Sequence, residues 1–168
     1  MSRENSAPPA GTIETPAAAG SASAAPVSIA ICCLAMILAL VLGVGLASHE
    51  VLRHIVQTLP LWVGVVLGFR HSRAVSWAAL PLFLFWLPLM ALIWAYLLGV
   101  SNVLSGHFSP VEVAMTIIVG AASIVGIVSF IRSQSSLTPL YRVALFVALA
   151  AVQVLCLRVS FLPAIAHR

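Results

Sequence analysis

The chain has 168 residues, of which 62% are hydrophobic and only 7% are Asp, Glu, Lys or Arg, and its net charge is +4. A water-soluble domain carries about 25% charged residues, so this composition excludes an ordinary soluble globule. It also argues against nucleic-acid binding, because the basic residues, all Arg, stand at the ends of apolar runs instead of forming a patch. One charged side chain at the centre of a membrane helix costs on the order of 2.5–3.5 kcal/mol, so this scarcity of charge favours an integral membrane protein.

Residues 1–26 form a segment of a different kind. Ala, Pro, Ser, Gly and Thr dominate it, and large apolar side chains are almost absent. Such a stretch buries too little surface to offset the entropy of ordering, so we expect a disordered tail. The first apolar run, 27–47, ends in a small-x-small triplet that resembles a signal-peptide cleavage site, but it is longer than the ~7–15 apolar residues of a signal peptide. A retained first helix is therefore expected.

Five apolar runs are the strongest signal in the sequence. They cover residues 27–47, 49–69, 75–98, 110–131 and 139–162. Each is long enough to cross a hydrocarbon core of ~30 Å at a helical rise of ~1.5 Å per residue. The sequence therefore predicts an all-α, polytopic integral membrane protein with a bundle of five transmembrane helices over 27–165. Four transmembrane helices are the alternative, if the first two runs are re-entrant or merge.

Local signals mark several helix ends. Ser109 and Glu112 have the spacing of a capping box, and Pro110 suits the first helical position between them. Ser48 is the expected N-cap of the second helix, and Gly99 is a natural residue to follow the third. These residues predict where the second and fourth helices begin and where the third ends.

Orientation follows from the Arg residues, because basic side chains favour the cytoplasmic side of a membrane. With five spans, one side receives Arg3, Arg70, Arg73, Arg132 and Arg142, and the other receives Arg53, Arg158 and Arg168. We therefore predict a cytoplasmic N-terminus and an extracytoplasmic C-terminus. Heavy use of Ala, Val and Arg, without Lys or Asp, is typical of a GC-rich bacterial genome, so the expected location is the bacterial cytoplasmic (inner) membrane.

Histidines and acids gather at the predicted extracytoplasmic side, where the candidate ligands of a metal or haem are His49, Glu50, His54 and His107. Imidazole and carboxylate suit Zn²⁺, and paired imidazoles suit haem iron. The sequence holds no HxxH or HExxH spacing, however. Residues at the water interface are free to be polar, so we favour interface polarity and predict no metal and no cofactor.

Three polar side chains lie deeper in the predicted helices, namely Arg53, Gln57 and Gln153. Ionisable groups inside a membrane are functional candidates by default, so the three are candidates to line a polar path. Hydrogen bonding between helices is the other interpretation of the two Gln side chains, whereas Arg53 is close enough to a helix end to reach the membrane surface.

Small residues recur at four-residue spacing in three of the predicted helices. The pairs are Gly64 with Gly68, Ala39 with Gly43, and Ala122 with Gly126. Such rows let helix backbones approach closely, which is how membrane helices pack. They predict contacts within the bundle or, alternatively, with a partner subunit.

No P-loop, GxSxG or dinucleotide-binding motif occurs in the sequence, so we do not expect an enzyme. The favoured function is that of a non-catalytic accessory, assembly or structural subunit of a membrane complex. Its expected partners are the lipid bilayer and a membrane protein or a second copy of the chain. The first alternative is a small oligomeric transporter or channel, because Pro60, Pro81 and Pro88 interrupt two helices near mid-membrane, where transporter sites form. The second alternative is the His-based metal or haem site.

Overall fold

The computed structural model describes residues 19–101, 108–133 and 136–166, and the regular structure in these ranges is entirely helical. The elements are α1 (Ala19–Leu38), the π-helical segment η2 (Ala39–Gly45), α2 (Val51–Phe69), α3 (Val75–Leu97), α4 (Pro110–Arg132), α5 (Pro139–Ser160) and the short α6 (Pro163–Ala166). Five helices, counting α1 and η2 as one, are long and apolar enough to cross a membrane. The chain is therefore an all-helical, multi-pass membrane protein, and five spans are found instead of the alternative four.

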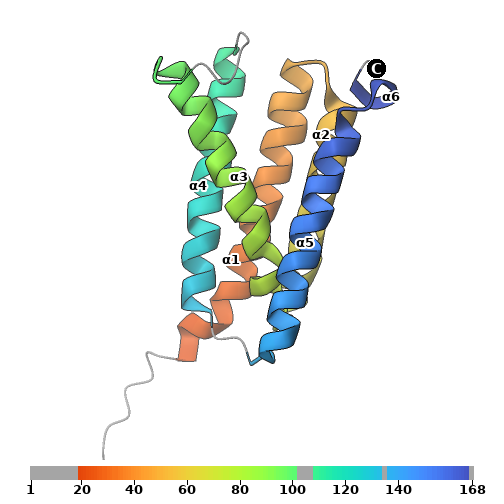
Figure 1. Ribbon diagram of the computed structural model, residues 1–168. Coiled ribbons are helices and arrows are strands. Elements are labelled where there is room, and N and C mark those ends of the chain that lie inside the picture. The colour runs from red at the N-terminus through yellow and green to blue at the C-terminus, as the bar shows by residue number, and fades with distance from the viewer. Residues whose placement is uncertain (1–18, 102–107, 134–135, 167–168) are drawn as a thin grey trace, which may run out of the picture.

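The helices run alternately up and down (Figure 1). Helix α1 packs between α2 and α4, and α5 packs on α2 and α3. Helix α3 runs diagonally, close to α5 at the bottom of Figure 1 and away from it at the top. We call the top of this view the upper end; it holds the turn from η2 to α2, the start of α4 and the end of α5. The candidate functional site lies at the upper end, where α3 and α5 diverge.

The first helix begins earlier than predicted. Residues 1–18 of the predicted disordered tail lie outside the described residues, but 19–26 are helical, so the tail prediction is wrong there. The prediction failed because it equated small side chains with an inability to pack. Ala25 is buried, and the hydroxyl of Ser28, one turn on, lies 2.9 Å from that of Ser129 on α4. Small side chains allow this close approach in a membrane bundle, and alanine is also the best helix former.

The turn between the first two spans differs from its prediction. Ser48 is not the N-cap of α2, because its hydroxyl donates to the carbonyl of Val44, 2.8 Å away, and the N-cap position is Glu50. Between them, His49 adopts a left-handed backbone with φ of 59°. The other predicted ends are confirmed: the capping box of Ser109 and Glu112 is present, and Gly99 follows α3 with φ of 71°.

The structure places the glycine pair of α2 at its crossing with α1. A Cβ atom on Gly64 would overlap the sulfur of Cys33, and one on Gly68 would overlap Ala30 and the carbonyl oxygen of Pro26. At Gly68 the α1 backbone itself comes this close, and at Gly64 the Cys33 side chain occupies the space that a Cβ atom would need. This face of α2 is therefore occupied within the bundle.

The other small residues also face neighbouring helices. Gly43 of η2 lies against Met115 of α4, and Gly126 of α4 lies against the ring of Phe83 on α3. Their row partners Ala39 and Ala122 are buried as well. All three rows of small residues therefore lie at contacts inside this chain.

Candidate functional site

A cavity of about 350 Å³ lies inside the upper half of the bundle, and we call it the upper cavity. Its polar lining consists of Ser48, Glu50, Arg53, His54, Gln57, Glu112 and Thr116. Its apolar and aromatic lining consists of Leu40, Val44, Trp86, Leu89, Met90, Ile93, Phe108, Val119, Leu157 and Phe161. The volume is within the range of sites for small molecules, and all five spans contribute to the walls.

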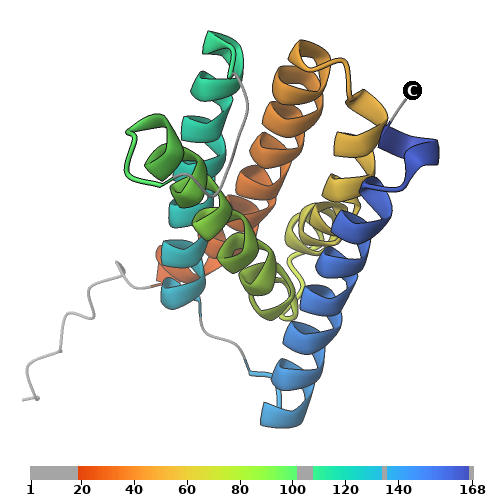
Figure 2. The ribbon, with the colours of Figure 1, turned by 45° about the horizontal axis from the view of Figure 1, so that its top comes forward.

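Helices α3 and α5 diverge toward the upper end (Figure 2), and residues of both helices line the upper cavity. Leu89, Met90 and Ile93 line it from α3, and Leu157 and Phe161 line it from the end of α5. Most polar lining residues come from the helix ends, whereas the α3 residues lie in the middle and second half of their helix. The cavity is thus polar near the membrane surface and mainly apolar toward its depth.

Arg53 lies at the polar end of the upper cavity. Its guanidinium Nη1 donates to the carboxylate of Glu50, 2.5 Å away, and the guanidinium stacks over the ring of Phe161 with its central carbon 4.2 Å from the ring centre. Its Nε is buried and has no hydrogen-bond partner among the described residues. The side chain is only 23% exposed, so Arg53 is held between α2 and the end of α5 instead of extending into water.

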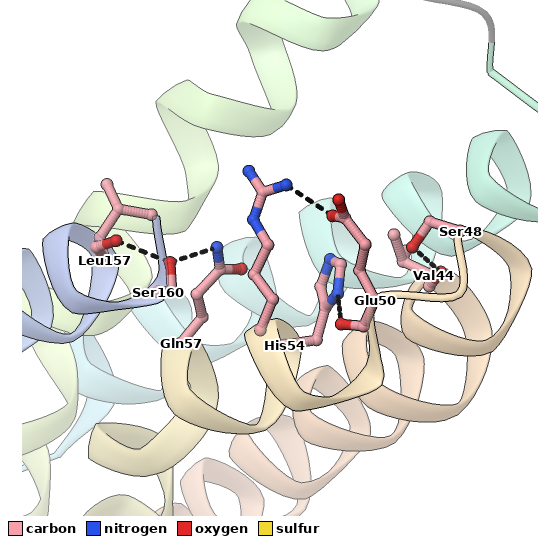
Figure 3. A network of polar contacts seen from close by, with 8 residues as sticks. Val44, Ser48, Glu50, His54, Gln57, Leu157 and Ser160 are labelled. Carbon is pink, nitrogen blue, oxygen red and sulfur yellow. Dashed lines mark hydrogen bonds and ion pairs between the residues drawn. The ribbon is translucent and has the colours of Figure 1, made fainter. Parts of the chain in front are cut away.

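His54 is fixed on the same face of α2. Its Nδ1 lies 2.9 Å from the backbone carbonyl of Glu50, which can only accept, so Nδ1 carries the proton (Figure 3). In a neutral ring Nε2 is then an acceptor, and Figure 3 shows this nitrogen on the far side of the ring from the bonded carbonyl. Glu50 and His54 therefore lie beside one another at the start of α2.

The candidate metal ligands do not gather into a cage. Among the described residues, no three His, Cys, Asp or Glu side chains lie close enough together to hold a metal ion. His49 is exposed in its turn and does not line the upper cavity, and His107 lies outside the described residues. Glu112 does line the cavity, but one of its oxygens accepts from the backbone N–H of Ser109 at 2.7 Å.

A chain of polar contacts, which we call the α2–α5 seam, joins α2 to α5. The Gln57 amide donates to the hydroxyl of Ser160 at 2.9 Å, and that hydroxyl donates to the carbonyl of Leu157 at 2.6 Å (Figure 3). The Gln153 amide donates to the backbone carbonyl of Gln57 at 3.2 Å. Gln153 and Ser160 are the buried residues of α5, so the most deeply buried side chains of this helix are polar. Both glutamines thus make contacts between helices, and Gln57 also lines the upper cavity.

The α2–α5 seam should be measurable as coupling between two substitutions. We expect Gln57→Leu and Ser160→Ala each to destabilise the protein, and the double variant to lose less than the sum by about 0.5–1.5 kcal/mol, the usual size of such a bond in a membrane bundle. Unfolding in detergent, followed by circular dichroism, measures the four free energies. Strictly additive losses would show that the hydrogen bond between Gln57 and Ser160 does not contribute to stability.

Sequence reasoning missed the contributions of the other helices to the cavity. Trp86 is 2% exposed, lines the cavity, and has an indole N–H without a partner among the described residues. A signal was available, because a tryptophan in the middle of a span brings an N–H that needs an acceptor. For Thr116 and Ser160, which are common residues in membrane helices, the sequence carries no comparable signal.

Known proteins do not add a family or a function to this geometry. Comparison of the chain with protein-family models, with curated proteins and with solved structures finds no match.

Proposed function

We propose that this membrane protein binds a small, mainly apolar molecule in the upper cavity. The observation that carries the proposal is the cavity itself, about 350 Å³ in volume and walled by all five spans. A space of this size between the spans is large enough to hold a small molecule. Apolar walls with a few convergent polar groups are also typical of small-molecule sites.

Ligand binding fits the cavity better than conduction of ions does. A conducting path needs polar groups along its whole length, yet the α3 part of the lining is Trp86, Leu89, Met90 and Ile93. Gln153 does not line the upper cavity, and the amide of Gln57, which does line it, donates to Ser160 in the α2–α5 seam. The proposal therefore keeps one part of the transporter alternative, the binding of a molecule between the helices, and does not include its transport.

The accessory-subunit prediction has less support. Its partner was expected to bind through rows of small residues, such as Gly64 and Gly68, and these face α1. If the Arg distribution sets the orientation as predicted, the polar end of the upper cavity faces the extracytoplasmic side of the membrane. That arrangement would give the site access to molecules from outside the cell.

Filling the cavity should weaken the binding of a small apolar molecule. We expect purified wild-type protein to bind phenylnaphthylamine, an uncharged fluorescent probe, saturably above the background of empty detergent micelles. Val44 lines the cavity, so Val44→Phe should weaken this binding at least tenfold by occupying the space. Leu42, two residues away, is 55% exposed and does not line the cavity, so Leu42→Phe is the matched control and should bind normally.

A fluorescence titration of the three proteins decides the question. The proposal is wrong if no protein binds the probe above the micelle background, or if Val44→Phe binds it as tightly as the wild type does. Thermal unfolding of each variant separates loss of the site from loss of the fold.

A further inference from the structure

We infer that the occupant of the upper cavity is an uncharged, lipid-soluble molecule with an oxygen that accepts a hydrogen bond, such as a ketone, quinone or ester carbonyl. This inference rests on the proposed function and names the chemical class of its ligand. It follows from two donors that lack acceptors and from the charges that line the same cavity.

The first observation is that two buried donors in the cavity lining have no acceptor. The indole Nε1 of Trp86 and the guanidinium Nε of Arg53 are both buried without a partner among the described residues. Each donates and neither accepts. A buried donor without an acceptor is costly, and in native proteins such groups are rare enough that each needs an explanation. An oxygen brought by a ligand would satisfy either group.

The position of Trp86 argues against water as that acceptor. Trp86 is half-way along α3, and the next lining residues of that helix are Leu89, Met90 and Ile93. A buried water is held by two to four polar partners, and these α3 neighbours of Trp86 offer none beyond the weakly accepting sulfur of Met90. A ligand with an apolar body and one oxygen fits both the walls and the indole N–H.

The second observation is the balance of charge, which excludes an anion as the best ligand. Arg53 is the cationic side chain of the lining, and it is already paired with Glu50. Glu112 adds a second carboxylate, so with a neutral His54 ring the lining carries one carboxylate more than it has cations. A ligand carboxylate would add to this excess of negative charge in a site of low dielectric. A cation would suit the charge but would leave both N–H donors without acceptors.

Four compounds of nearly equal shape separate these possibilities. They are methyl naphthyl ketone, ethylnaphthalene, the naphthoate anion and the naphthylethylammonium cation. Ethylnaphthalene replaces the carbonyl of the ketone with a methylene group, so the difference between the two isolates the acceptor oxygen. Each is titrated against the purified full-length protein by displacement of phenylnaphthylamine, with partition into empty micelles subtracted.

We expect the wild-type protein to bind the ketone about tenfold more tightly than ethylnaphthalene, and more tightly than either ion. Trp86→Phe removes the indole N–H and keeps an aromatic ring, so it should reduce the preference for the ketone to about twofold or less while still binding ethylnaphthalene. Trp62 is 47% exposed, so Trp62→Phe is the control and should keep the full preference. If Trp86→Phe does not fold, Trp86→Met, which fills the space with a flexible chain, takes its place.

The failures of the two proposals are distinguishable. Equal binding of ketone and ethylnaphthalene would overturn the acceptor argument, and so would a ketone preference that survives in Trp86→Phe. Tightest binding of naphthoate or of the ammonium ion would overturn the charge argument. In each of these cases the proposed function stands if phenylnaphthylamine still binds in the cavity, whereas it falls if that probe does not bind either.

Discussion

Gly68→Ala is expected to lose about 1–3 kcal/mol of stability, the usual cost of forcing extra atoms into a packed core, and Gly68→Leu should lose more. The added Cβ would overlap the carbonyl oxygen of Pro26 and the Cβ of Ala30. The first of these atoms is backbone, so no change of rotamer relieves the overlap. Helices α1 and α2 would have to move apart along their crossing. Thermal unfolding in detergent measures the loss.

Gly120→Ala is the matched control for this substitution. The nearest atom to a Cβ on Gly120 would be Met90 Cβ, at an ordinary van der Waals distance of 3.9 Å. Both substitutions exchange glycine for alanine inside a helix, which by itself favours the helix by about 1 kcal/mol. Gly120→Ala should therefore be neutral or stabilising. If Gly68→Ala instead unfolds like the wild type and only disrupts an oligomer, α1 and α2 do not cross at Gly68 and the partner-subunit interpretation gains support.

The five spans were predictable because a membrane places one physical requirement on the sequence. Backbone groups in hydrocarbon must be satisfied within a helix, so each span leaves an apolar run of a set length. The capping box at Ser109 and the left-handed Gly99 were predictable for a related reason, since helix ends are determined by neighbouring residues. The start of α1 was not predictable, because a segment rich in Ala and Ser can form either a disordered tail or a closely packed helix.

The candidate site was predictable only where it lies on one helix. Glu50, Arg53 and His54 share the first turns of α2, and their spacing alone places them on one face. The groups that they meet come from elsewhere in the chain. Ser160, for example, is 103 residues from its partner Gln57. The pairing of spans decides such contacts, and apolar runs carry almost no information about which run lies beside which.

Phe83 and Gly126 form a contact on which we expect the site to depend. Phe83 is fully buried, and a Cβ on Gly126 would overlap three atoms of its ring. Gly126→Ala should therefore destabilise the protein by about 1–3 kcal/mol. Phe83→Leu alone should cost on the order of 1 kcal/mol as a smaller group in a packed site. The double variant should recover part of the loss, because leucine leaves room for the new methyl group.

The same contact should influence binding in the upper cavity. Phe83 and Trp86 are three residues apart, so they lie on one face of α3, and Trp86 lines the cavity. A displaced Phe83 ring moves this turn of α3 away from α4 and carries the indole with it. We therefore expect Gly126→Ala to weaken phenylnaphthylamine binding severalfold and Phe83→Leu in the same chain to restore it in part. Unfolding and binding measured on the four proteins test both effects. Additive losses of stability, with no recovery of binding, would mean that α3 and α4 do not meet through these two residues.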